Sequence, residues 1–129
     1  MPVIRDKHDV ESARKLVALG YPVVAPALSD MMEWIQDMNW PVAKVLAPFL
    51  AALGEAVVPE VRRVLASDDH LWKYWCINDI IGEMPVKAAR QFTADLHRYA
   101  LTPTEAERKE ELDEVAKAAL SRIDEQSGA

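Results

Sequence analysis

The sequence has a single cysteine, Cys76, and only four glycines among its 129 residues. One cysteine cannot form an internal disulfide, so we expect the chain to suit a reducing compartment and take the cytoplasm as its location. Four glycines are too few for glycine-rich phosphate or dinucleotide loops, and the sequence contains neither those motifs nor a serine nucleophile elbow. We therefore expect no cofactor and no recognisable catalytic motif.

Long apolar runs and an excess of positive charge are also missing. The longest apolar stretch, residues 41–53, contains Lys44 and falls short of the roughly 18 residues that a membrane span needs. The first residues carry charges without an apolar core, so we expect no secretory signal. Nucleic acids and anionic membranes attract clustered Lys and Arg, whereas the formal net charge here is -6. We expect no nucleic-acid or membrane partner, and any charged protein partner should be basic.

The sequence is rich in helical periodicity. Asp9 and Gly20 are placed to begin and end a first helix, Pro41 suits the first turn of a third, and Thr104 with Glu107 predicts a capping box. Apolar residues at spacings of three and four predict helices at about residues 10–19, 23–36, 41–53, 55–66, 70–84, 86–100 and 105–123. No segment alternates with a period of two, which predicts an all-α fold.

The helix predicted at residues 41–53 has almost no polar face. Lys44 is its one charged residue, so we expect neighbouring helices to cover it on more than one side. An uncovered apolar face of this size would favour association.

Two corners of the chain resemble one another. Pro26, Met31 and Asp37 are echoed by Pro59, Val64 and Asp68, a period of about thirty to thirty-three residues. Helix pairs of that size are typical of stacked repeats, because one pair cannot bury its apolar face alone. We predict a single domain over residues 1–125, in which six or seven helices stack as antiparallel pairs in a short right-handed superhelix. Residues 126–129 are predicted to fray, and an irregular bundle is the alternative fold.

The corner motifs resemble a known family. The bacterial family called domain of unknown function 5071 has similar motifs, which in this chain are Leu19–Pro22, Ala25-Pro26, Trp34–Ala43, Ala47–Leu50, Ser67–Asp69 with Trp72–Trp75, and Pro103–Glu105. The resemblance covers nearly the whole chain. It implies an all-helical fold similar to HEAT-type repeats, with no established activity.

The two corners also supply the candidate binding surface. Its residues are Trp34, Asp37, Asn39 and Trp40 at the first corner, and Asp68, Asp69, His70 and Trp72 at the second. We expect the aspartates, Asp37 and Asp68 above all, to cap the helices that follow them. Alternatively, stacked corners bring Asp37 and Asp69 together as a small acidic pocket for a cation or for an Arg of a partner.

The four tryptophans allow two interpretations. They can seal the packing between successive helix pairs, with each indole N–H bonded to a corner carbonyl. Alternatively, Trp40 and Trp72 protrude beside the acidic residues and anchor a partner. The sequence favours packing, because large aromatic rings commonly fill cores.

The helix predicted at residues 70–84 carries the most functional groups. We predict an inward stripe of Tyr74, Ile77, Ile81 and Met84, with Lys73, Cys76 and Glu83 on the wetter side. A nucleophilic Cys76 lacks a histidine at a suitable spacing. His70 with Asp68 and Asp69 offers three metal ligands but no motif that fixes their geometry, so we predict no metal site.

These patterns favour a protein-binding domain without chemistry of its own. One concrete form is an adaptor or immunity-type protein whose acidic surface neutralises a basic partner, and the acidic final helix could form part of that surface. The competing class is an enzyme, metal-binding or small-ligand domain that uses Asp37, Asp69, His70 and the tryptophans in a cleft. A homo-oligomer formed by an apolar flank is a third possibility.

Overall fold

The computed structural model describes residues 1–127, which contain helices and no strand. The α-helices are α1 (Val10–Leu19), α2 (Leu28–Glu33), α3 (Pro41–Ala52), α4 (Val58–Leu65), α5 (His70–Cys76), α6 (Val86–Ala89), α7 (Thr93–Leu101), α8 (Glu105–Lys109) and α9 (Leu112–Ser127). Short 3-10 turns adjoin them, namely η1 (Ala25–Ala27), η2 (Trp34–Gln36), η3 (Gly54–Val57) and η5 (Arg90–Phe92), and the π-helical turn η4 (Ile77–Ile81) continues α5. The all-α prediction is confirmed.

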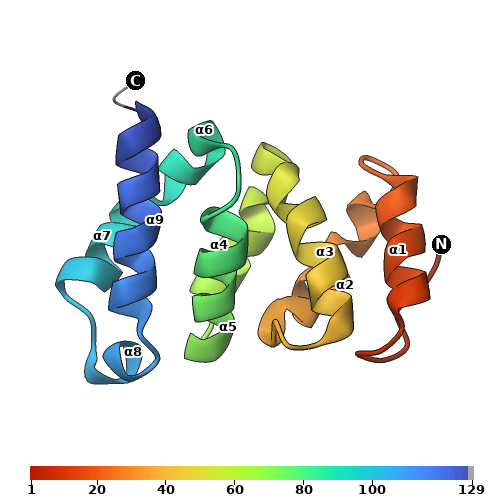
Figure 1. Ribbon diagram of the computed structural model, residues 1–129, viewed down its shortest axis with the longest axis horizontal. Helices are drawn as coiled ribbons and strands as arrows, with labels where there is room; N and C mark the ends of the chain where they lie inside the picture. Colours follow the sequence, from red (N-terminus) through yellow and green to blue (C-terminus); the bar gives the residue numbers. More distant parts are fainter. Residues whose placement is uncertain (128–129) are drawn as a thin grey trace.

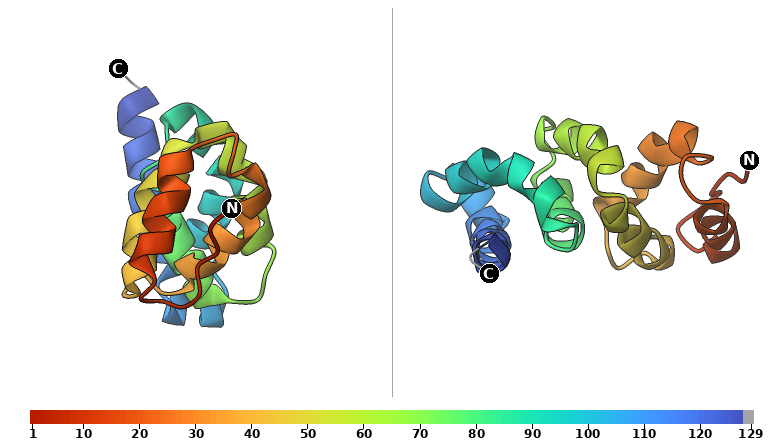
Figure 2. Two further views of the ribbon diagram at one scale, coloured as in Figure 1. Left: turned by 90° about the vertical axis from the view of Figure 1, so that its right-hand side faces the viewer. Right: turned by 90° about the horizontal axis from the view of Figure 1, so that it is seen from above.

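The helices form two rows. The first row consists of α1, α3, α5 with η4, and α9, and the second consists of α2, α4 and α7 (Figure 2, right). Within the first row the helices run in one direction, and those of the second row run in the opposite direction (Figures 1 and 2). Contacts join α1 to α3, α3 to η4, and η4 to α9, so each first-row helix packs on the next.

Local sequence signals account for where α1 and α3 begin. The Asp9 carboxylate accepts a hydrogen bond from the backbone N–H of Ser12 and caps α1, while Gly20 follows the helix with a φ of 72°. Pro41 occupies the first turn of α3, where its missing N–H costs little. Neighbours on two sides bury α3, as its apolar sequence predicts, and leave Lys44 exposed.

Several predicted helices are interrupted. The segment at residues 23–36 contains η1, α2 and η2, and the segment at residues 55–66 is divided into η3 and α4. The segment at residues 86–100 is divided into α6, η5 and α7, and the final segment breaks between α8 and α9. At that break Glu111 has a φ of 60°, which turns the chain, so the prediction of one continuous final helix is wrong. Helix α9 continues to Ser127, two residues into the segment for which we predict fraying, and residues 128 and 129 lie outside the described residues.

Two adjacent arginines of α4 link the second row. The Arg63 guanidinium reaches back to α2, where it donates to the carbonyl oxygen of Ser29 (3.2 Å) and pairs with Glu33 (3.4 Å). Arg62 reaches forward to α7 and pairs with Asp95 (2.6 Å). These partners lie 30 to 34 residues apart in sequence, close to the period of the repeated corners.

A buried glutamate ties α7 to α8. Glu107 is only 3% exposed; its carboxylate pairs with the Arg98 guanidinium and accepts the backbone N–H of Thr104 (2.8 Å). The Thr104 hydroxyl accepts the backbone N–H of Glu107 in return, which confirms the predicted capping box. The bond from Arg98 is the main reason that the pKa of Glu107 falls from 4.5 to about 2.

Candidate functional site

The first corner is a local turn joined to a tryptophan pair. The rings of Trp34 and Trp40 lie edge to face with centroids 5.8 Å apart, and both are half-buried against the core. The Asp37 carboxylate accepts the backbone N–H of Asn39 (2.8 Å), which closes a turn before the helix starts. Trp40 is the N-cap residue of α3 and supplies no side-chain bond. The expectation that Asp37 caps α3 is therefore wrong, because its carboxylate serves the turn.

At the second corner the residue that caps α5 is Asp69, one position after the predicted Asp68. The Asp69 carboxylate accepts the backbone N–H of Trp72 (3.0 Å) and caps α5. Asp68, which we expected to cap, is exposed and makes no such bond among the described residues. His70 is half-buried, and its Nδ1 atom has no hydrogen-bond partner among the described residues. At the second corner, therefore, Asp69 and not Asp68 stabilises the start of α5.

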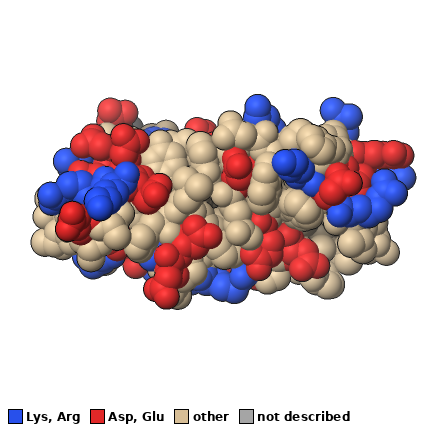
Figure 3. Space-filling model, turned by 90° about the horizontal axis from the view of Figure 1, so that it is seen from below, with Lys and Arg blue, Asp and Glu red and all other residues tan. Residues whose placement is uncertain are grey.

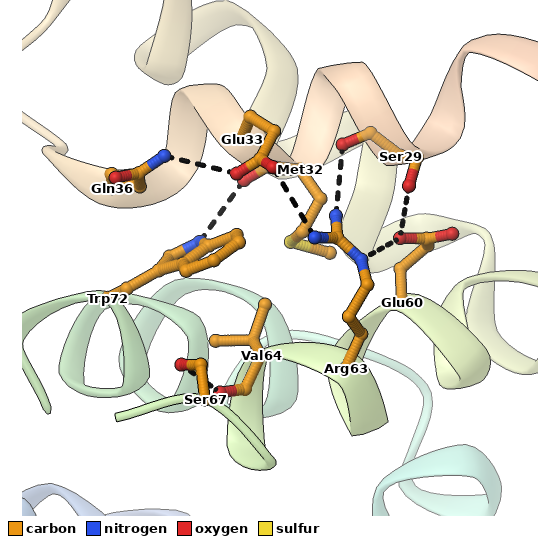
Figure 4. Close-up of polar contacts among 9 residues, drawn as sticks. All are labelled: Ser29, Met32, Glu33, Gln36, Glu60, Arg63, Val64, Ser67 and Trp72. Carbon is orange, nitrogen blue, oxygen red and sulfur yellow. Dashed lines mark hydrogen bonds and ion pairs between the residues drawn. The ribbon is translucent and has the colours of Figure 1, made fainter. Parts of the chain in front are cut away.

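Trp72 lies in the joint between the two rows. Its indole N–H donates to the carbonyl oxygen of Met32 (3.2 Å), 40 residues away in sequence, and the residue is 7% exposed. The Arg63 guanidinium lies 5.4 Å from the ring centroid. Figure 4 shows the indole directed toward α2, with the Glu33 side chain above it and the Arg63 side chain at its right. The packing interpretation is confirmed for Trp72, which does not protrude toward solvent.

The corners are neighbours, because η2 packs against α5. Among the described residues, however, no group of three His, Cys, Asp or Glu side chains is placed to hold a metal ion. At the end of the molecule where the corners lie, acidic side chains form separate groups with basic groups between them (Figure 3). This end therefore shows no single continuous acidic surface.

The inward face of α5 differs from the predicted stripe. Lys73 and Cys76 are buried, whereas Tyr74 is only half-buried and Asn78 is exposed. The reason is that α5 packs against α4, η2 and α9 at once, so its buried arc is wider than one stripe. Burial raises the pKa of the Cys76 thiol to about 12, which keeps it protonated and unsuited to nucleophilic attack at neutral pH.

A groove that the sequence patterns did not predict lies between α3 and η4. Its volume is about 440 Å³, and it is lined by Met38, Lys44, Ala47, Pro48, Ala51, Ala52, Asp79 and Glu83. Ala47 and Ala51 are each 2% exposed and lie deepest, while Pro48 and Ala52 are exposed at the surface. Short side chains at this helical spacing leave the space open. That run of alanine and proline on α3 is the sequence signal that could have revealed the groove.

One wall of the groove is shaped by the π-helical turn. The backbone N–H of Gly82 donates to the carbonyl oxygen of Ile77, five residues earlier (2.8 Å). A Cβ atom on Gly82 would lie 2.5 Å from the carbonyl oxygen of Asn78, too close for any side chain to fit without a backbone shift. The turn thus depends on glycine at this position. Turns of this kind are frequent at functional sites.

Substituting Gly82 is expected to destabilise the fold. We expect Gly82→Ala to lower the free energy of unfolding by about 1–3 kcal/mol, because the added methyl group overpacks the turn. Urea denaturation followed by circular dichroism measures the change. Gly20→Ala is the control, since a Cβ there meets open space and only the positive φ is strained. A Gly82 variant no less stable than the Gly20 variant would contradict the assignment of this turn.

Two carboxylates in the groove have no cationic partner. Neither Asp79 nor Glu83 forms a salt bridge with a described residue, although Lys44 lines the same groove. Burial raises the pKa of Asp79, a hydrogen bond from Asn78 opposes that rise, and the nearby negative charge of Glu83 adds to it. The charged form of Asp79 is therefore poorly compensated. A cation placed between the two carboxylates would stabilise both.

The comparison with protein families agrees with the motif resemblance. The family model described as Domain of unknown function (DUF5071) matches residues 3–120. The chain belongs to this family. The match spans both corners, the whole of α3 and the groove, so these features lie within the DUF5071 domain. No curated protein matches the sequence. No described helix of this DUF5071 member is long and apolar enough to cross a membrane.

Proposed function

We propose that this DUF5071 chain is a HEAT-like α–α superhelical domain of the bacterial cytoplasm that binds another protein and catalyses no reaction of its own. Its contact surface is the groove between α3 and η4. The observation that carries the proposal is that this groove joins an apolar floor of short side chains to the unpaired carboxylates of Asp79 and Glu83.

The floor of the groove suits a partner helix. Interaxial distances between packed helices depend on the side chains at the contact, so alanines such as Ala47 and Ala51 allow close approach. Pro48 lies within α3, and its exposed ring adds apolar surface to the groove. The groove therefore offers a partner an apolar surface of short side chains on α3.

The charges of the groove favour a basic partner. An Arg or Lys of the partner that reaches Asp79 and Glu83 would form charge-assisted hydrogen bonds with two carboxylates that pair with no cation among the described residues. The net charge of -6 also favours association with a basic protein, the same kind of partner that the groove carboxylates favour. An adaptor or immunity-type role, in which the domain neutralises a basic protein, is the concrete form that we propose.

Affinity capture with matched variants tests this function. The tagged wild-type chain, the double variant Asp79→Lys with Glu83→Lys, and the control Glu125→Lys on exposed α9 are used in parallel against bacterial lysate and against products of neighbouring genes. We expect a basic protein that the wild type and the control retain and the double variant loses. Its dissociation constant should rise at least about tenfold with the double variant, the scale of one lost charge pair.

Two results would contradict the proposal. One is the absence of any protein retained by the wild type above the background of an unrelated helical domain. The other is a partner retained equally by the wild type and the double variant, which would place the contact elsewhere. Light scattering of the isolated chain shows whether a second copy, rather than another protein, occupies the groove.

A further inference from the structure

A second cavity lies at the N-terminal end of the molecule, away from the groove. Its volume is about 400 Å³, and it lies among an arm formed by residues 1–4, helix α1 and the segment from η1 to η2. Figure 2 (left) shows the arm passing between α1 and α2. Leu16 and Met31 are buried at the floor, and Ile4 and Trp34 are partly buried beside them. The size and the mainly apolar lining are those of small-molecule sites.

The charged side chains that line this cavity are both anionic. Asp30 and Glu33 line it, and no Lys, Arg or His does. Glu33 accepts a hydrogen bond from Gln36 (3.1 Å) and pairs with Arg63 (3.4 Å). Asp30 has neither a hydrogen bond nor an ion pair with any described side chain, and the amino group of Met1 forms no salt bridge in the described part of the chain. The exposed Asp30 carboxylate thus has no ion pair in the described part of the chain, although Met1 lines the same cavity.

We infer that the cavity binds a small cationic amphiphile, an amine whose apolar body packs on Leu16, Met31 and Trp34 while its ammonium group meets Asp30. The indole ring of Trp34 adds a surface that attracts cations. Glu33 contributes negative charge from α2 although Arg63 shares it. This site stands independently of the groove, because the residues that line the two spaces do not overlap.

Three probes of equal hydrocarbon content separate charge from shape. They are 3-phenylpropylamine, which is cationic, 3-phenylpropan-1-ol, which is neutral, and 4-phenylbutyrate, which is anionic. Calorimetric titration of the full chain is expected to give the amine at least about tenfold tighter binding than the alcohol, with the carboxylate weakest. The Trp34 indole N–H resonance in a nitrogen-15 correlation spectrum should shift on saturation with the amine.

Matched variants locate the site. Asp30→Asn should weaken the amine about fivefold to tenfold and leave the alcohol unchanged, whereas Asp124→Asn on exposed α9 should change neither. Ala27→Phe, which fills the cavity, should weaken both the amine and the alcohol, with its fold checked by circular dichroism. Equal binding of amine and alcohol, an unchanged amine affinity in Asp30→Asn, or no binding of the amine up to about 10 mM would each overturn the inference.

Discussion

Replacing Trp72 by alanine is expected to lower the free energy of unfolding by about 3–5 kcal/mol, the usual cost of removing a buried aromatic ring. The ring is 7% exposed, and its N–H is bonded to the Met32 carbonyl, so the substitution removes apolar contact and leaves that acceptor without its donor. It also removes the aromatic face beside Arg63. Chemical denaturation followed by far-ultraviolet circular dichroism measures the loss.

Two controls separate the parts of this effect. Trp72→Phe keeps a ring and loses the hydrogen bond, so we expect a smaller cost of about 1–2 kcal/mol. Trp34→Ala removes a half-buried ring and should cost less than Trp72→Ala. If the free energy of unfolding of Trp72→Ala lies within about 1 kcal/mol of the wild-type value, the contact between α2 and α5 at Trp72 does not contribute substantially to stability.

Replacing Glu107 by glutamine is expected to lower the free energy of unfolding at pH 7 by about 2 kcal/mol. The shift of the Glu107 pKa from 4.5 to about 2 corresponds to a larger free energy than this, which is an upper limit. Solvent around the half-exposed Arg98 screens the ion pair and lowers its contribution to stability. The glutamine keeps the size of the side chain and removes the negative charge. Thermal or urea unfolding at pH 7 compares the two proteins.

The same variant should change the acid limb of the stability curve. Because the folded-state pKa of Glu107 lies below its unfolded value, its contribution is fully present above about pH 5 and is lost as the pH falls from 4.5 toward 2. The stability difference between wild type and Glu107→Gln should therefore shrink over that window. A difference that stays constant from pH 7 to pH 2.5 would show that the carboxylate charge does not stabilise the α7–α8 joint.

Helix starts were the part of the fold that the sequence predicted best. Asp9, Pro41 and the Thr104–Glu107 capping box act on backbone groups within three residues, so their effect is visible in the sequence itself. The recurrence near thirty residues was also visible, and the contacts of Arg62 and Arg63 span that distance.

The arrangement of the site depended on contacts that no local pattern contains. A single helical stripe predicts Lys73 and Cys76 on the solvent side of α5, whereas α4, η2 and α9 together bury a wider arc that includes both residues. The π-helical turn arises where Gly82 bonds five residues back, and the groove exists only because α3 and η4 are neighbours. The sequence therefore indicated the kind of residues involved but not the surface that they form.

The corner residues illustrate the same limit. Asp37 and Asp68 occupy matching places in the two corners, yet Asp37 closes a turn, and Asp69 rather than Asp68 caps the following helix. Trp72 is committed to the interior, whereas Trp34 borders the N-terminal cavity. The aspartates and tryptophans of the corners thus indicated where the chain turns between helices. They did not indicate which of these side chains are free to contact a ligand or partner.

Hydrogen exchange of the complex tests the central proposal most directly. After capture of the partner, backbone amide exchange is compared between the free and bound chain. Binding in the groove predicts added protection in residues 44–52 of α3 and 77–83 around η4, with the corner segments 34–36 and 66–72, which do not line the groove, unchanged. Protection confined to those corner segments, with α3 and η4 unaffected, would contradict the groove as the contact surface.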